Sequence, residues 1–151
     1  MKDQTATDSA DFEFEDFDAA NTATMSVIVA GRVTGWKWTF AGPGHAQTVA
    51  QANRSARERL QLEAEQSQAR VNGRKWKAPE ESVDEVRARN IDYVIERLVG
   101  WSPVKIGGAT YEFSAEAARK LLADPAKVGL LTQALEFLAA DNSFTKRSAA
   151  I

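Results

Sequence analysis

The side chains with the most versatile chemistry are scarce in this chain of 151 residues, which holds one histidine and no cysteine. The lack of cysteine excludes disulfides, a thiolate zinc site and a cysteine nucleophile. His45 follows a Gly-Pro-Gly turn without companion ligands nearby in the sequence, and a lone loop histidine is usually solvated or caps a helix. The acidic residues cluster near the N-terminus and at expected helix starts, where solvation and the helix dipole explain them. We therefore predict no catalytic residue, no metal site and no enzyme activity.

The segment GPGHAQT, residues 42–48, lies between an expected strand and an expected helix, as phosphate-binding loops do. It lacks the third glycine of a dinucleotide fingerprint and the Gly-Lys-Ser/Thr of a P-loop. Pro43 also removes one of the amide donors that such a loop needs. We interpret the segment as an ordinary turn and predict that the protein binds no cofactor.

Three large rings, Trp36, Trp38 and Phe40, stand two residues apart in TGWKWTF. Alternate residues of a strand point to the same face, so these rings should line one side of a sheet. We expect at least two of them to pack on a helix predicted over about residues 79–100, since a hairpin alone is marginally stable. Aromatic residues dominate interfaces, so a ring left at the surface would serve as a binding anchor. We name Trp36 and Trp76 as candidate partner-binding residues.

The charges are unevenly distributed, although the net charge is only −2. Residues 1–20 carry −6, residues 21–77 carry +6 and residues 78–151 carry −2. Such an acidic block is typical of a solvated tail or an interaction arm. We predict a flexible acidic arm over residues 1–22, followed by a single domain over residues 23–151. Phe12, Phe14 and Phe17 alternate with acids in the arm and are further candidates for binding a partner.

The basic segment over residues 54–77 supports two interpretations. Its arginines and lysines, with Trp76 available for stacking, would suit nucleic acid, yet glutamates interrupt it and the sequence pI is about 5.5. A solvent face with salt bridges fits this pattern better. We therefore assign Arg54 and Arg57 to a protein partner and keep a nucleic-acid-binding regulator as an alternative.

Element boundaries follow from periodicity and turn residues. Residues 25–33, with a turn at Ala30-Gly31-Arg32, and residues 34–40 predict a hairpin. A helix is expected over about residues 47–70, with Val49, Ala52, Ala56 and Leu60 on one stripe. Beyond Leu62 the stripe fades, which indicates a solvated spur or a surface for a partner. A second helix should begin near Pro79 and end at Gly100, and VKIGGATYEF predicts a small hairpin.

Two more helices should begin at Ser114 and at Asp124-Pro125, the latter with Val128, Leu131, Leu135 and Leu138 on one stripe. The predicted fold is therefore α+β and mainly α, with about four helices and the small hairpin between the second and third of them. No apolar run approaches the length of a membrane span, and the acidic start does not read as a secretory signal. We expect a soluble protein.

Three segments together resemble a known family. They are the strand pair ending in TGWKWTFAGPGH, the basic helix QTVAQANRSARERL and the segment from LVGWSPVKIGG to DNSFTKRS. Over about residues 25–148 the chain is similar to tail assembly chaperones of long-tailed bacteriophages and the small tail proteins grouped with them. The matching positions are Gly35 to Gly44, Trp101-Ser102-Pro103 and Phe144. Residues 63–82 and the phenylalanine-rich arm have no counterpart in this resemblance.

The resemblance implies a non-enzymatic protein of the host cytoplasm, without a shared active site. Such proteins bind the tape-measure protein and keep it soluble while tail-tube subunits assemble around it. The alternative from another class is a structural component that stays in the virion, in the tail or at the head-tail junction. Self-association into a homo-oligomer is left open.

Overall fold

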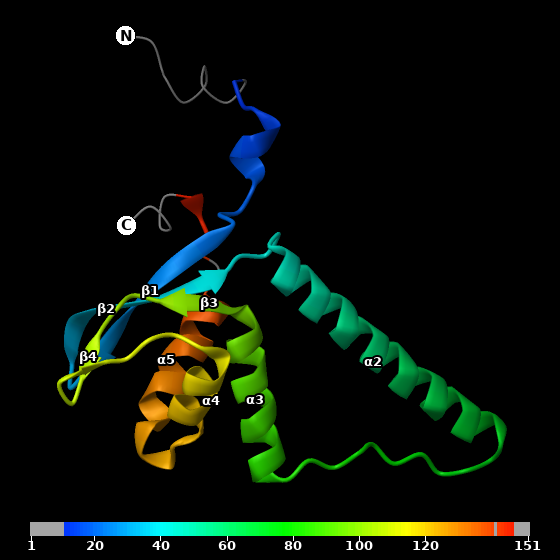
Figure 1. The fold of residues 1–151 in the computed structure, drawn as a ribbon. Helices are drawn as coiled ribbons and strands as arrows, with labels where there is room; N and C mark the ends of the chain where they lie inside the picture. Colours follow the sequence, from blue (N-terminus) through cyan, green and yellow to red (C-terminus); the bar gives the residue numbers. More distant parts are fainter. Residues whose placement is uncertain (1–10, 141, 147–151) are drawn as a thin grey trace.

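An antiparallel three-stranded sheet with helices packed against one face forms the centre of the molecule (Figure 1). The structure is a computed structural model that describes residues 11–140 and 142–146, so the first ten residues of the predicted arm lie outside the described part. The strands β1 (Thr22–Val29), β2 (Arg32–Ala41) and β3 (Leu98–Trp101) are neighbours in that order. The helices of the described residues are α2 (Ala46–Val71), α3 (Val83–Arg97), α4 (Ala115–Ala123) and α5 (Val128–Ala139). The predicted α+β fold, mainly α, is confirmed.

The β1–β2 hairpin turns through Ala30 and Gly31, whose φ angles are 50° and 77°. Two consecutive residues with positive φ are typical of the tight turn that matches the twist of antiparallel strands. The register places Met25 opposite Trp38, and a bulge interrupts β1 between Ser26 and Ile28. The predicted N-terminal hairpin is therefore present, with its turn where the sequence places it.

The three aligned rings of β2 all belong to the hydrophobic core. Trp36, Trp38 and Phe40 are 8%, 0% and 0% exposed, and the Phe40 ring lies 5.6 Å from the ring of Phe137 in α5. Lys37, between the rings, points to the exposed side of the sheet. The expectation that at least two rings pack in the core is confirmed. However, the rings pack against three helices and not against α3 alone, because α3, α4 and α5 all contribute buried residues to this core.

The predicted second helix is too long at both ends. α3 begins at Val83, where the Ser82 hydroxyl accepts a hydrogen bond from the Glu85 amide at 3.1 Å. It ends at Arg97, and the next four residues form β3, which the sequence did not predict. A bulge opposite Thr39 and Phe40 lets both Leu98 and Trp101 face the core. Burial of these two side chains favours the strand over another helical turn.

The C-terminal part follows the predicted order. β4 (Lys105–Ile106) and β5 (Ala109–Thr110) form the small hairpin, with Gly107 and Gly108 at φ 62° and 82°. The Ser114 hydroxyl caps α4 by accepting a hydrogen bond from the Ala117 amide at 2.9 Å. Asp124-Pro125 starts the short 3₁₀ helix η2 (Pro125–Lys127), so α5 begins three residues later than predicted. Val128, expected on the apolar stripe, is therefore exposed.

Helix α2 extends away from the body, and residues 72–82 return the chain to the start of α3 (Figure 1). Among its 26 residues only Gln51 is buried. Its contacts with α3 lie in its first three turns, where Gln51 Nε2 donates to the Tyr93 carbonyl at 3.2 Å and Arg54 pairs with Glu96. The apolar stripe predicted from spacing thus covers no core, since Val49 and Leu60 are 44% and 58% exposed.

Candidate partner-binding surfaces

His45 has a structural role at the start of α2. Its Nδ1 accepts a hydrogen bond from the Gln47 amide at 3.1 Å, so the side chain caps the helix. Within residues 11–140 and 142–146, no three His, Cys, Asp or Glu side chains are grouped so that they could hold a metal ion. None of the helices described is both long and apolar enough to span a bilayer.

Among the described acidic groups, the Asp124 carboxylate has the most clearly shifted pKa. Hydrogen bonds from Lys127 Nζ and from the Ala126 amide, with the Lys127 and Arg87 charges, hold the pKa of Asp124 below its ordinary value of 3.8. The two hydrogen bonds are 2.5 and 2.9 Å long. The Asp124 side chain is 37% exposed and caps η2 by accepting from the Ala126 amide, so its arrangement serves the helix start.

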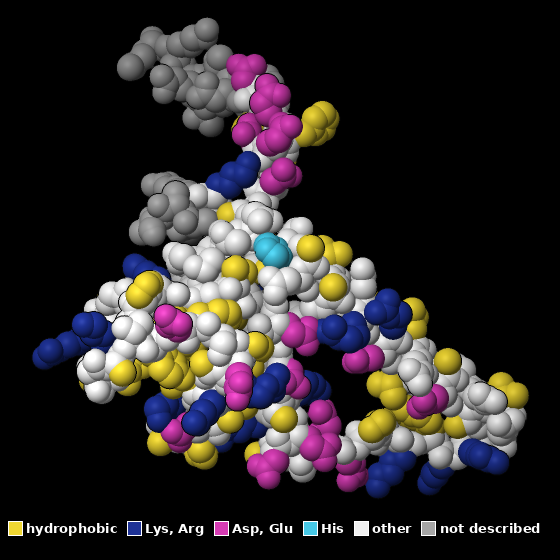
Figure 2. Space-filling model, viewed as in Figure 1, with side chains coloured by type: hydrophobic (Ala, Val, Ile, Leu, Met, Phe, Trp, Pro, Cys, Tyr) yellow, Lys and Arg dark blue, Asp and Glu magenta, His cyan; other side chains and the backbone are white. Residues whose placement is uncertain are grey.

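The aromatic arm, which we define as residues 11–19, leads away from the body at the start of β1 (Figure 1). Its residues Phe14–Phe17 form the 3₁₀ turn η1, closed by a reciprocal capping box between Glu13 and Asp16. Phe12, Phe14 and Phe17 are 59%, 90% and 75% exposed. Acidic side chains surround them, as Figure 2 shows at the top of the molecule.

The base of the aromatic arm is tied to the C-terminal segment. The Ala20 amide donates to the Phe144 carbonyl at 2.7 Å, and Lys146 Nζ donates to the Glu15 carbonyl at 2.5 Å. These two contacts fix where the arm leaves the body.

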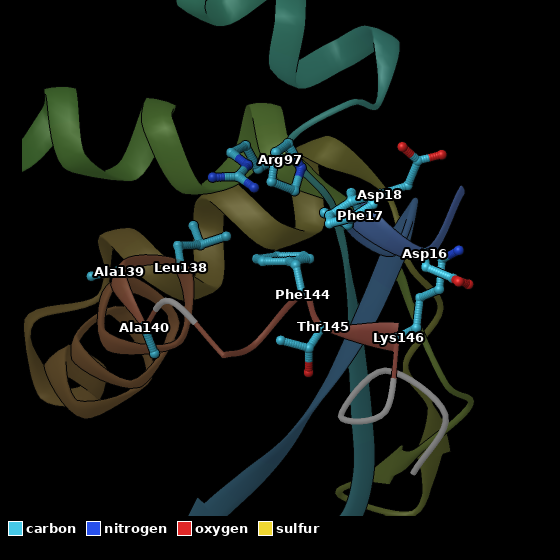
Figure 3. A pocket seen from close by; sticks show the side chains of 12 residues that line it. Asp16, Phe17, Asp18, Arg97, Leu138, Ala139, Ala140, Phe144, Thr145 and Lys146 are labelled. Atoms are coloured by element: carbon cyan, nitrogen blue, oxygen red, sulfur yellow. The ribbon is translucent and has the colours of Figure 1, made fainter. Parts of the chain in front are cut away.

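A hollow of 460 Å³ lies beside this base (Figure 3). It is lined in part by Phe17, Arg97 and Phe144. Arg97 is only 6% exposed, and its guanidinium donates to the Ala41 carbonyl from both Nε and Nη2, at 3.2 and 2.6 Å. The same group lies 5.2 Å from the centre of the Phe144 ring. Arg97 therefore joins α3, β2 and the C-terminal segment, and its role here is structural.

Helix α2 and the segment after it carry the other predicted partner-binding residues. Arg54 is held by Glu96 in the same chain, whereas Arg57 is exposed on the helix surface. Trp76 is half-buried beside Gln66, Arg70 and Arg74 near the far end of α2. Arg57 and Trp76 are thus displayed on the extension, away from the body of the protein.

A second apolar surface lies at the opposite end of the sheet from the arm. Two adjoining hollows of 500 and 580 Å³ flank the β1–β2 turn, and both are lined by Val29, Trp36 and Ile106. Ile28 and Leu130 extend the second of them. We call this surface the tip groove. The Trp36 indole N–H is buried and has no hydrogen-bond partner among the described residues.

The spacing of the rings singles out Trp36, but it does not point to the neighbours of Trp36 in the tip groove. A signal was present in Val27-Ile28-Val29, because three consecutive apolar residues in a strand place an apolar side chain on both faces. Val27 is buried, while Ile28 and Val29 are exposed. The contributions of Ile106 and Leu130 depend on how the β4–β5 hairpin and α5 pack beside the sheet, which spacing along the chain does not reveal.

The predicted partner-binding residues thus fall on three separate surfaces. Trp36 borders the tip groove but is buried in the core, so it is not the exposed anchor that a ring left at the surface would be. The three phenylalanines lie on the aromatic arm, and Arg57 and Trp76 lie on the extension formed by α2 and its return segment. Arg54 stands at the inner end of that extension, paired with Glu96. Comparison of the chain with protein-family models, with curated proteins and with solved structures gave no match.

Proposed function

We propose that this protein is a non-enzymatic assembly chaperone that binds a partner protein through α2. The observation that carries the proposal is the solvent exposure of a helix of 26 residues in which Gln51 alone is buried. Isolated helices gain little stability from propensity alone, and most helices in proteins are stabilised by packing an apolar face. A long helix held away from its own core is therefore suited to pack against another protein.

The apolar side chains of α2 indicate which side of the helix a partner would contact. Val49, Ala56 and Leu60 recur at helical spacing, whereas Gln51, which meets α3, lies about 160° around the helix axis from Val49. The stripe therefore faces away from α3. Small alanines on it allow a close approach, and Arg57 beside it adds a donor for acidic or carbonyl groups.

The resemblance to phage tail assembly chaperones supplies the identity of the partner. In the proposed function, α2 binds a helical segment of the tape-measure protein in the host cytoplasm while tail-tube subunits assemble around that protein. The same exposure of α2 would also suit a structural virion component. A chaperone should be absent from purified virions, whereas a structural component should be detected in them by mass spectrometry.

Co-expression with the tape-measure protein of the same phage tests the proposal, with the soluble fraction of that protein as the readout. Leu60→Glu places a charge on the stripe and should reduce the soluble tape-measure protein at least tenfold. Leu62→Glu is the matched control, because Leu62 is exposed on the other side of the same helix and should tolerate the change. Equal solubility with both variants, or with no chaperone at all, would contradict the proposal.

Trp76→Ala provides an independent test at the far end of the extension. Because Trp76 lies outside the core, its removal should leave the melting temperature nearly unchanged while weakening co-purification of the tape-measure protein. A loss of about 3–5 kcal/mol in unfolding free energy, as for a buried aromatic, would show instead that Trp76 is a structural residue.

A further inference from the structure

The tip groove and the aromatic arm have complementary chemistry. Apolar side chains line the groove, and Trp36 within it has a buried indole N–H without a partner in the described residues. The arm carries three exposed rings, of which Phe17 also lines the hollow beside Phe144. Burying a ring of this size removes a large apolar area from water. A ring of the arm that docks in the groove would therefore bury apolar surface on both sides of the contact.

The charges around the two surfaces are opposite in sign. Arg32 directly follows the β1–β2 turn and Lys105 precedes Ile106, and neither belongs to an ion pair within the described part of the chain. Lys127, which also lines the groove, is already neutralised by Asp124. The arm offers Asp11, Glu13, Glu15, Asp16 and Asp18 around its rings. The acidic aromatic arm and the apolar groove with its neighbouring cations are therefore complementary in both charge and hydrophobicity.

A chain cannot place its arm in its own groove while the base of the arm is tied. The arm leaves at the start of β1, and the groove lies at the other end of this strand, about 26 Å away for its eight residues. The hydrogen bonds of Ala20 to Phe144 and of Lys146 to Glu15 hold the intervening segment at the first end. From Glu15, the three residues back to Phe12 reach only about 10 Å.

We propose that the aromatic arm of one copy docks in the tip groove of a second copy. The donor surface and the acceptor surface are different parts of the chain at opposite ends of the sheet (Figure 1). Such a contact is heterologous, so it leaves a free groove on one copy and a free arm on the other. Repetition of the contact produces an open chain of copies or a closed ring.

Sedimentation equilibrium of the full-length chain, from about 1 μM to about 1 mM, tests this head-to-tail contact. The average mass should rise with concentration above the 16.5 kDa of one chain. An arm variant, in which Phe12, Phe14 and Phe17 are replaced by serine, should stay at that mass. A groove variant with Val29→Glu and Ile106→Glu should do the same, because it adds negative charge where the acidic arm docks.

Mixing the two variants distinguishes this geometry from other modes of self-association. The arm variant keeps an intact groove and the groove variant keeps an intact arm, so an equimolar mixture should form a complex of twice the single-chain mass and no larger species. Val33→Glu is the control, because Val33 is exposed on the neighbouring strand but lines neither hollow, and this variant should associate like the natural chain. Circular dichroism checks that every variant is folded.

Several results would overturn the proposal. A natural chain that stays monomeric over the whole range has no such contact. Continued self-association of the arm variant or the groove variant would place the contact elsewhere, for example on α2. A mixture of the variants that forms no complex would also contradict docking of the arm in the groove. None of these measurements involves a phage partner, so they are independent of the proposed chaperone function.

Discussion

At the scale of single residues, Gly42 determines how the arm joins the body. Its amide donates to the Asn21 carbonyl at 2.7 Å, and a Cβ at this position would collide with the Ala20 carbonyl oxygen. The neighbouring atoms belong to the backbone, which a side-chain rotation cannot move aside. Gly42 is therefore required for a close approach of two backbone segments and not for a special backbone angle.

We expect Gly42→Ala to lower the unfolding free energy by about 1–3 kcal/mol, the usual range for overpacking a filled site. Chemical denaturation of the full chain measures this loss. Gly44→Ala is the matched control two residues later, since a Cβ there would meet no atom within 4 Å. Equal stability of the two variants would mean that the segment before β1 moves away at no cost.

Residue chemistry also explains why the sequence analysis placed the three rings correctly. The alternation of Trp36, Trp38 and Phe40 with smaller or polar residues admits one strand orientation, because the opposite orientation would bury Lys37. The cost of burying an unpaired lysine is large enough to decide the register without knowledge of the helices that cover the sheet.

At the scale of elements, the boundaries of α3 show what local patterns could not reveal. Gly100 predicts the end of a helix, because glycine is common just after a helix. The chain instead turns into β3, where Leu98 and Trp101 gain burial against the rings of β2. This gain depends on a pairing between residues some 60 positions apart, whereas capping patterns describe only near neighbours.

Helix α2 shows the converse difficulty. Its i,i+3 and i,i+4 spacing predicts a helix over about residues 47–70, and the observed helix spans Ala46–Val71. The same spacing predicts an apolar face but does not show whether that face packs on the protein's own core or on a partner, because both kinds of face have the same periodicity. Its length and the fading of the stripe after Leu62 were the clues to an exposed extension.

The start of α5 gives an element-level prediction about pH. The Lys127 hydrogen bond is the main cause of the lowered pKa of Asp124, so the folded chain favours the charged carboxylate. A group whose pKa is lower in the folded state stabilises the fold above its unfolded pKa, and this stabilisation is lost as the pH falls through the folded pKa. Its contribution should therefore be complete at neutral pH and lost below the ordinary value of 3.8.

Asp124→Asn should accordingly lower the melting temperature at neutral pH and have a smaller effect at about pH 2, because the stabilisation by the charged carboxylate is lost as the pH falls toward and through its lowered folded pKa. Thermal unfolding of both chains followed by circular dichroism at the two pH values tests this expectation. A difference in melting temperature that is the same at both pH values would assign the effect to the altered hydrogen bonds instead of to charge.

At the scale of the whole molecule, α2 and its return segment are an excursion from the folded body. Along the sequence, the next buried apolar residue after Ala41 is Ile91, and no residue of α2 belongs to the core cluster. The two ends of the excursion are separated by about the length of α3, or roughly 22 Å for its 15 residues. The body should therefore fold without the excursion.

Replacing residues 49–79 with a flexible linker of about 14 glycines and serines, which spans about 20 Å on average, tests this independence. We expect a cooperative thermal transition within a few degrees of that of the full chain, because the core and the sheet are unchanged. Under the proposed function, the shortened protein should also no longer keep the tape-measure protein soluble. A chain that no longer unfolds cooperatively would show that α2 contributes to the stability of the body.

The arrangement of the indole rings gives the protein two separate optical reporters. The rings of Trp36, Trp38 and Trp101 lie 5.3–5.5 Å apart, whereas Trp76, the last of the four tryptophans, stands on the extension. Rings this close share their electronic transitions, so the three should give a coupled near-ultraviolet dichroic band that vanishes when the body melts. Trp76, the one tryptophan of the four that is not buried, should be the one that iodide quenches. One sample can therefore report binding at the extension and integrity of the core at different wavelengths, without an added dye.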